Sequence, residues 1–220
     1  MNLHSKLSRV VLLTLLTLAV RPAVAQVSFS VGPHVSTLGV GISGEVRVTP
    51  LIGVSAEYNF FPVSNFERSG FNSEFLIEPT IGGAMVLVML HPGGGRFGIG
   101  AGLLQGGASA DATMALDPNA SAEIEIGDGA YSASQVGTLL GAFEFGKTQP
   151  AFALGWLGGG LNFVLGAAIA TPTLTLDATG PLANDPTFRA DLDREISDFD
   201  DWASKVPVYP YIRLGWQFGF

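Results

Sequence analysis

The 220-residue chain contains no cysteine, only three histidines, and few charged residues, which make up 14% of the sequence. Without cysteine there can be no disulfide, thiolate metal site, lipidated cysteine or cysteine nucleophile. Stability therefore has to come from backbone pairing and side-chain packing. Acidic residues outnumber basic ones and give a formal charge of −8, so nucleic acid is not an expected partner.

Only one long apolar run is present, and it lies at the start of the chain. Lys6 and Arg9 precede an apolar stretch at 10–20, and small residues follow at Ala23 and Ala25. The run is shorter than the roughly 20 residues that a spanning helix needs, which predicts a secretory signal peptide over residues 1–25. Removing it takes away three basic residues and no acid, so the charge falls to −11 over a single domain at 26–220.

The rest of the composition is unusual for a water-soluble domain. It combines 29 glycines, a mean hydropathy of +0.38 and little charge. A membrane β-barrel accounts for all three, because its backbone polar groups pair between strands and its outward face is apolar over its whole height.

Period-two alternation supports this reading along most of the chain. Apolar residues alternate with glycine and polar residues, with short breaks at Thr49-Pro50, His91 to Gly95 and Gly158 to Gly160 and an expected bulge at Pro150. The expected strands cover residues 27–31, 38–48, 52–60, 75–89, 96–114, 138–156, 161–175 and 208–220. This predicts an all-β fold, an eight-stranded antiparallel transmembrane up-and-down barrel.

Connection lengths set the expected topology. Short connections near 49–50, 91–95 and 157–160 alternate with long ones near 63–73, 115–136 and 177–205, and such barrels keep short turns periplasmic and long loops extracellular. Both termini are then periplasmic. An even strand count requires a strand at 27–31, which Gly32-Pro33 is expected to shorten. Ten strands would require a further hairpin within 117–135.

The expected interior consists of small residues with a few charges. Alternation directs Met85, Leu87 and Met89 outward with the apolar face. The lumen-facing candidates are Glu45, Arg47, Glu57, Glu78, Glu144 and Arg213. Buried charges need partners, which favours an ionic core that holds the barrel shut, while a water-filled, cation-favouring conduit is the alternative.

The last long connection predicts a helix. Asn184-Asp-Pro-Thr can cap it, and apolar residues then recur at helical spacing through Lys205, opposite an acidic face. This acidic face lacks the glycine and the later glutamate of an EF-hand, so we interpret it as solvated. The apolar face is expected to pack on the barrel rim or to cap its mouth.

Catalysis finds little support. His34 and His91 are expected near opposite ends of the barrel, and His34 with Ser36 is the one plausible base and nucleophile pair. The glycine-rich stretch at 93–102 lacks the lysine of a nucleotide-binding loop. We therefore expect no enzymatic activity, no catalytic residue, no cofactor and no metal site.

Several segments together resemble a family of bacterial outer-membrane β-barrel proteins in the style of the OmpA-like and OmpW-type eight-stranded barrels. They are Thr37-Leu-Gly-Val-Gly, His91-Pro-Gly-Gly-Gly with Arg96-Phe-Gly-Ile-Gly-Ala-Gly-Leu-Leu, Tyr131-Ser-Ala-Ser-Gln-Val-Gly, Leu154-Gly-Trp, residues 172–178, residues 188–201 and Tyr209-Pro-Tyr-Ile-Arg-Leu-Gly-Trp-Gln-Phe-Gly-Phe. The resemblance implies a fold and the outer membrane of a Gram-negative cell envelope. It implies no binding residues, but the terminal strand, with Trp216, Phe218 and Phe220, would be the signal that the barrel assembly machinery recognises.

Two functions remain open at this stage. The first is a monomeric, non-enzymatic barrel with a structural or surface-interaction role, in contact with membrane lipid and lipopolysaccharide. The alternative is a porin-like barrel that transports cations or small hydrophobic compounds. A soluble periplasmic β-protein is a distant third.

The two faces of the terminal strand predict different mutant behaviour. Phe220→Ala should mainly lower the amount of barrel assembled in the outer membrane, whereas Arg213→Ala should mainly lower folded stability or alter conductance. Outer-membrane fractionation and heat-modifiable gel mobility distinguish the two effects. Equal behaviour of the two variants would contradict the assignment of their faces.

Overall fold

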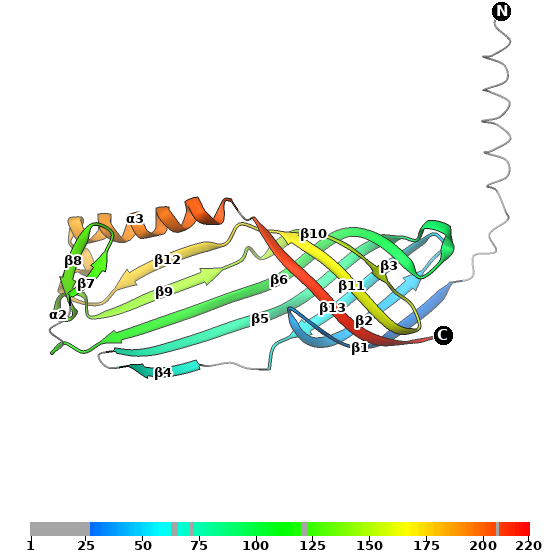
Figure 1. Ribbon diagram of the computed structural model, residues 1–220, viewed down its shortest axis with the longest axis horizontal. Helices are drawn as coiled ribbons and strands as arrows, with labels where there is room; N and C mark the ends of the chain where they lie inside the picture. The colour runs from blue at the N-terminus through cyan, green and yellow to red at the C-terminus, as the bar shows by residue number, and fades with distance from the viewer. Residues whose placement is uncertain (1–26, 63–65, 71–72, 120–122, 206) are drawn as a thin grey trace, which may run out of the picture.

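The computed structural model describes residues 27–62, 66–70, 73–119, 123–205 and 207–220. The expected signal peptide, residues 1–25, lies outside these ranges. The described chain is elongated, with a barrel at the end that carries the C-terminus and a second lobe, here called the head, at the other (Figure 1).

Eight antiparallel strands form a closed ring. β13 pairs with β1 on one side and β11 on the other, and β5 pairs with β6 to complete the circle. The ring strands are β1 (Ser28–Ser36), β2 (Gly39–Arg47), β3 (Ile52–Phe60), β5 (Ser73–Leu90), β6 (Phe97–Leu116), β10 (Thr148–Trp156), β11 (Gly160–Ile169) and β13 (Val208–Gly219). The predicted eight-stranded up-and-down barrel is confirmed.

The outer wall of the ring is apolar because each strand alternates sharply between exposed and buried residues. Along β3 the pattern is strictly alternating from Ile52 to Phe60, and β10 behaves in the same way. Aliphatic and aromatic side chains cover the outside, including Val88 at 61% exposure, Leu103 at 54% and Trp216 at 52%. Most ring strands are 9 to 12 residues long, close to the roughly 9–11 that a tilted strand needs to cross a bilayer.

The first strand is longer than expected. β1 continues through Gly32 and Pro33 to Ser36, and its pairing with β2 is unbroken. Its ladder with β13 is interrupted at these two residues, and a Cβ on Gly32 would lie 1.9 Å from the Trp216 carbonyl oxygen. The missing N–H of Pro33 is therefore accommodated by a local gap on one side, and the connection between the expected strands 27–31 and 38–48 shrinks to a turn after Ser36.

β5 and β6 continue beyond the ring and carry the head. They remain paired over their full lengths, from Ser73 opposite Leu116 to Leu90 opposite Ile99. Gly82 and Gly83 face Gly107 and Gly106 where the ribbon leaves the ring, here called the neck. A Cβ on Gly83, whose φ is +145°, would lie 2.2 Å from the Gln105 carbonyl oxygen, so this close backbone approach requires glycine.

The head is a five-stranded sheet with short elements packed around it. β4 (Phe66–Gly70) adds to β5, β9 (Thr138–Glu144) adds to β6, and β12 (Thr173–Ala178) adds to β9. β7 (Glu123–Ile126) and β8 (Gly129–Ser132) form a separate hairpin, followed by α2 (Ala133–Val136). The hairpin considered for a ten-stranded barrel thus exists but lies outside the ring.

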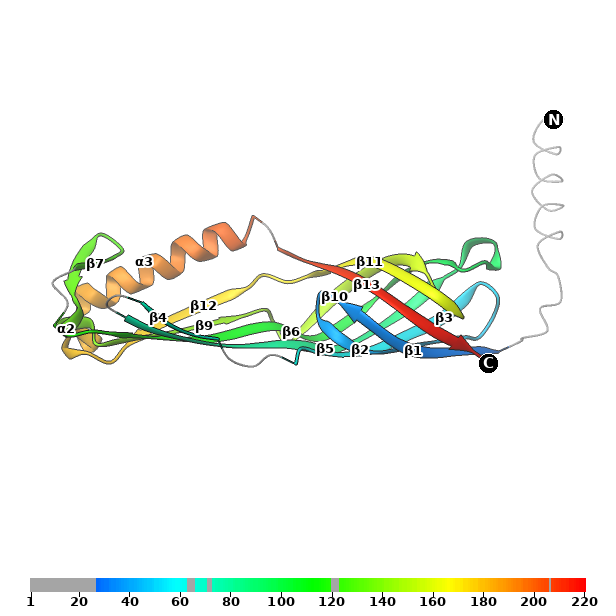
Figure 2. The ribbon, with the colours of Figure 1, turned by 60° about the horizontal axis from the view of Figure 1, so that its bottom comes forward.

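The predicted helix is α3 (Pro186–Ala203), which follows a short 3₁₀ turn, η2 (Pro181–Asn184). The Asp185 carboxylate caps it by accepting hydrogen bonds from the backbone N–H groups of Thr187 and Phe188. Phe188 and Leu192 are buried against the sheet and the hairpin, so the apolar face packs on the head and does not plug the ring. Figure 2 shows α3 lying along one side of the sheet, near β12.

Two expected strand details were wrong. Pro150 lies within β10, opposite Leu103, and pairing to β11 begins one residue later at Ala151, so no bulge is needed. The strand expected over 138–156 is divided instead at 145–147, between β9 and β10. The strand expected over 161–175 is likewise divided at 170–172, between β11 and β12. A further 3₁₀ turn, η1 (Pro92–Gly94), joins β5 to β6. Both interruptions coincide with the passage from ring to head.

The neck glycines give a direct test. Gly83→Ala should lower the free energy of unfolding by about 1–3 kcal/mol, because the methyl group meets a fixed carbonyl oxygen and the residue has a positive φ. Gly141→Ala is the matched control, since Gly141 has an ordinary φ and its nearest new contact would be Leu176 at 3.5 Å. Urea unfolding followed by heat-modifiable gel mobility measures both. Equal stability of the two variants would show that the neck tolerates a side chain.

Candidate functional site

The interior of the ring has a polar half and an apolar half. The polar half comes from β1, β2, β3 and β13, with Asn162 of β11 beside it. Its buried polar and charged residues are Ser30, His34, Ser43, Glu45, Ser55, Glu57, Asn59, Arg213 and Gln217. These side chains lie on the inward face because they alternate with the exposed apolar residues of the wall.

Glu57 is the centre of the cluster nearer the neck. Its Oε2 lies 2.5 Å from the Nη1 of Arg213, and both side chains are almost fully buried. Its Oε1 accepts hydrogen bonds from the Tyr211 hydroxyl and from Asn59 Nδ2, the latter at 3.1 Å. One carboxylate therefore joins β3 to β13 across the inside of the barrel, and its charge is balanced by the guanidinium.

His34 and Ser36 both bind the other side of Asn59. His34 Nε2 lies 2.7 Å from Asn59 Oδ1, and the Ser36 hydroxyl donates to the same oxygen at 2.7 Å. Since the Asn59 amide nitrogen already donates to Glu57, its oxygen is the acceptor and His34 Nε2 carries a proton. Ser36 and His34 are both donors to one oxygen, so Ser36 is not activated as a nucleophile.

A second cluster lies at the terminal end of the ring. His91 Nε2 is 2.5 Å from Glu45 Oε1, and Arg47 Nε is 3.2 Å from the same oxygen. His91 Nδ1 lies 3.1 Å from the Phe97 carbonyl oxygen, which can only accept, so this nitrogen is the donor. His91 was interpreted as a turn residue, and its ionic contact with Glu45 of β2 is seen only in the folded ring.

The apolar half corrects the expected register of β5. Met85, Leu87 and Met89 are 1–4% exposed and pack inside the ring with Leu104, whereas Val86, Val88 and Leu90 are on the outside. Residues 85–90 are apolar at every position, so alternation alone does not indicate which face is inward. Pairing with β3 and β6 decides it, and the interior is more apolar than expected.

The six lumen-facing candidates divide into two groups. Glu45, Glu57 and Arg213 are buried within the ring, and Arg47 lies partly exposed at its terminal end. Glu78 and Glu144 are exposed and lie in the head, opposite Asp111 and Ser109 of β6, beyond the point where β10 completes the ring. Their expected lumen position is wrong because β5 continues past the barrel and β9 lies wholly in the head.

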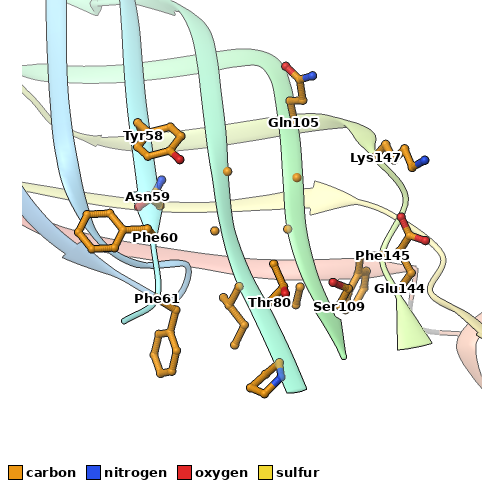
Figure 3. A pocket seen from close by; sticks show the side chains of 17 residues that line it. Tyr58, Asn59, Phe60, Phe61, Thr80, Gln105, Ser109, Glu144, Phe145 and Lys147 are labelled. Carbon is orange, nitrogen blue, oxygen red and sulfur yellow. The ribbon is translucent and has the colours of Figure 1, made fainter. Parts of the chain in front are cut away.

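A basin of about 630 Å³ lies at the neck, where the wall consists of glycine backbone. Exposed aromatic residues lie on one side of it, and polar residues, among them Gln105, Glu144 and Lys147, lie on the other (Figure 3). Gln149 underlies this region: its Nε2 donates to the carbonyl oxygens of Gly106 and Gly146, at 2.9 and 2.5 Å. This glutamine, which sequence analysis did not single out, ties β10 to the β6 side of the neck.

A third polar cluster holds the head together. The Tyr131 hydroxyl donates to Asp191 Oδ2 at 2.5 Å, and Arg194 contacts both Asp191 and Asp128, at 2.7 and 3.0 Å. The hydrogen bond to Asp191 raises the pKa of Tyr131 to about 12, and the same bond lowers the pKa of Asp191 below its usual range. Asp191 is therefore ionised at neutral pH.

Within the described ranges, no group of three or more histidine, aspartate or glutamate side chains is arranged to hold a metal ion. Across those same residues, no helix is long and apolar enough to span a bilayer.

Comparisons with known proteins identify the fold. No family model and no curated protein matches the chain. The crystal structure of Acinetobacter baumannii CarO2 matches with a TM-score of 0.55 and 16% identity, covering 89% of this chain and 100% of that one. The crystal structure of A. baumannii CarO matches with a TM-score of 0.51 and 15% identity, covering 87% and 97%. This likeness extends to the fold, while OmpA-like or OmpW-type membership stays a prediction.

The pair of Glu57 and Arg213 predicts strong coupling. Glu57→Gln alone or Arg213→Met alone should each lower the free energy of unfolding by about 3–5 kcal/mol, because each leaves a buried charge without its partner. The double variant should lose much less than the sum of the two. Urea unfolding in detergent micelles, arranged as a double-mutant cycle, measures the coupling. Additive losses within about 0.5 kcal/mol would contradict a direct interaction.

Proposed function

We propose that the protein is an integral outer-membrane barrel with a non-catalytic role, whose closed ring anchors the head at the cell surface. One observation carries the proposal: the ring presents an apolar outer wall while its buried charges face inward and are paired. A water-soluble barrel needs a polar outer wall, since an apolar wall of this extent would be exposed to water. Because the ring is closed, the backbone N–H and C=O groups of its strands pair with one another and need no water, as a bilayer requires.

The orientation follows from the connections. The turns after β2, β5 and β10 are short and lie at the end where β1 begins and β13 ends, whereas the head occupies the other end. In outer-membrane barrels short turns are periplasmic and long connections extracellular. Both termini would then be periplasmic and the head extracellular, where its acidic surface meets lipopolysaccharide. Assembly through the barrel assembly machinery, with the exposed Trp216, Phe218 and Phe220 as the recognised residues, and a monomeric state belong to the same proposal.

The interior favours a ring that does not conduct. Apolar side chains from β5, β6, β10 and β11 pack against Tyr211 inside the ring, beside the polar half. At the terminal end, Arg47 Nη1 donates to the Gly95 carbonyl oxygen at 2.8 Å and Arg96 Nε to the Leu157 carbonyl oxygen at 3.0 Å. These bonds tie the short turns to the ring and to one another. An eight-stranded barrel is narrow enough for side chains to fill.

Planar-bilayer recording on the refolded protein tests the closed ring. We expect no stable unitary conductance at neutral pH, because the interior is filled by packed apolar side chains and paired charges. Refolding is verified first by heat-modifiable gel mobility, so that a silent bilayer reflects a folded barrel. Stable unitary steps would overturn the closed-ring proposal.

One observation favours the alternative, a narrow transport barrel. Both amide atoms of the fully buried Asn162, and Nε and Nη2 of Arg213, have no hydrogen-bond partner among the protein atoms. Buried polar atoms of this kind are commonly bound to water, and water bound at these atoms would form a hydrated path through the ring. If the barrel conducts cations, Glu45→Gln and Glu57→Gln should change its ion selectivity. Unchanged selectivity in both variants would exclude the cation path.

A further inference from the structure

The head contains an apolar pocket of about 260 Å³ between α3 and the sheet. Its walls include Phe75 and Ile77 of β5, Ala112 of β6, Leu139 of β9, Leu176 of β12 and Leu192 of α3. α3 packs beside β12, so it leaves the β5 side uncovered, and Phe75 and Ile77 are 38% and 41% exposed. These residues lie beyond the ring, where membrane lipid does not explain an exposed apolar surface.

The pocket exists because one side chain is missing from its floor. Gly141 has no positive φ and a Cβ there would make only ordinary contacts, at 3.5 Å or more. Unlike the neck glycines, Gly141 is not required by the backbone conformation or by a close backbone approach. A larger residue would fill the space, so the glycine keeps the floor open.

The charge at the edge of the pocket limits what can bind. The Glu195 carboxylate borders the pocket and accepts a hydrogen bond from the Gly127 N–H at 2.8 Å. Nearby, Arg194 is shared between Asp191 and Asp128, so one positive charge lies among three carboxylates. The local field is therefore negative, which disfavours a fatty-acid anion or another acidic ligand and favours an uncharged or cationic one.

Volume sets the size of the ligand. An apolar cavity of about 150 Å³ can hold a benzene molecule, so a pocket of about 260 Å³ suits a compound with one or two fused rings. We propose that the head binds a small hydrophobic molecule of this size, uncharged or cationic, between α3 and the open face of β5, β6 and β9. The site lies outside the ring, so it goes beyond the proposed anchoring role and is independent of conduction.

The absence of cysteine allows a direct test by thiol protection. Ala112→Cys places a thiol at an exposed position of the pocket, and Thr175→Cys places one on the opposite face of the head sheet, as a matched control. Each variant is treated in detergent with iodoacetamide, with or without 1-naphthylmethylammonium, 1-naphthalenemethanol or 1-naphthoate. Alkylation rates are measured by mass spectrometry. Probe lost to micelles affects both variants equally.

We expect the cationic and neutral probes to slow alkylation of the Ala112→Cys variant about tenfold at saturation, with no effect on Thr175→Cys. Equal protection by 1-naphthoate would overturn the charge assignment, and equal protection of both variants would overturn the site. Protection of Ala112→Cys that rises with protein concentration alone would assign the pocket to a second copy of the chain and also overturn the proposal.

A second measurement separates binding from a general change in the head. Fluorescence anisotropy of 1-naphthylmethylammonium, corrected for empty micelles, compares the unmodified protein with Gly141→Leu. Filling the floor should weaken binding about tenfold or more. Ala142→Leu adds the same side chain one residue later, on the other face of β9, and should bind as the unmodified protein does. Gly141→Leu with unchanged affinity, in a barrel that keeps its heat-modifiable mobility, would overturn the proposal.

Discussion

Pairing of β1 with β13 is the constraint on which the rest of the structure depends. It closes the ring, ending in a reciprocal pair of backbone hydrogen bonds between Phe29 and Phe220, at 3.3 and 2.8 Å. Closure removes every free edge from the ring and separates an inside from an outside. Only then can Glu57 and Arg213, on strands far apart in the sequence, meet where water is scarce. In an open sheet both charges would be exposed to solvent, and no enclosed interior would lie behind the apolar wall.

Closure also explains the division of the interior. Strands β1 to β3 and β13 supply most of the polar side chains, and β5, β6, β10 and β11 supply mainly apolar ones, apart from Gln149 and Asn162. Ion pairs therefore lie in one half of the interior, while apolar packing fills the other. Burying ions in this way is costly unless every partner is in place. The clusters around Glu57 and Glu45 each contain an ion pair between strands or turns that are far apart in the sequence, so each cluster links two parts of the ring and fills its interior.

The head is a consequence of two unusually long strands. β5 and β6 continue past the neck, and their inward face becomes one side of an open sheet that α3 covers only in part. Within the ring that face is enclosed by other strands, whereas in the head its uncovered part forms the apolar pocket. At the neck, where the strands leave the ring and enter the head, glycines allow the backbones of neighbouring strands to approach closely. Anchoring and ligand binding can therefore reside in separate parts of one chain.

Alternation, turn residues and connection lengths were sufficient to determine the all-β class, the eight strands, the burial of Glu45, Glu57 and Arg213, and a helix capped before Pro186, because these follow from local periodicity and local chemistry. The tertiary structure alone decided the rest. Residues 85–90 are apolar on both faces, so pairing with β3 had to select Met85, Leu87 and Met89 for the interior. Glu78 and Glu144 alternate as ring residues do, yet they lie in the head, because a strand's periodicity does not record where its neighbours end. The ionic contact of His91 and the pocket above Gly141 likewise arise from strands and helices that meet only after folding.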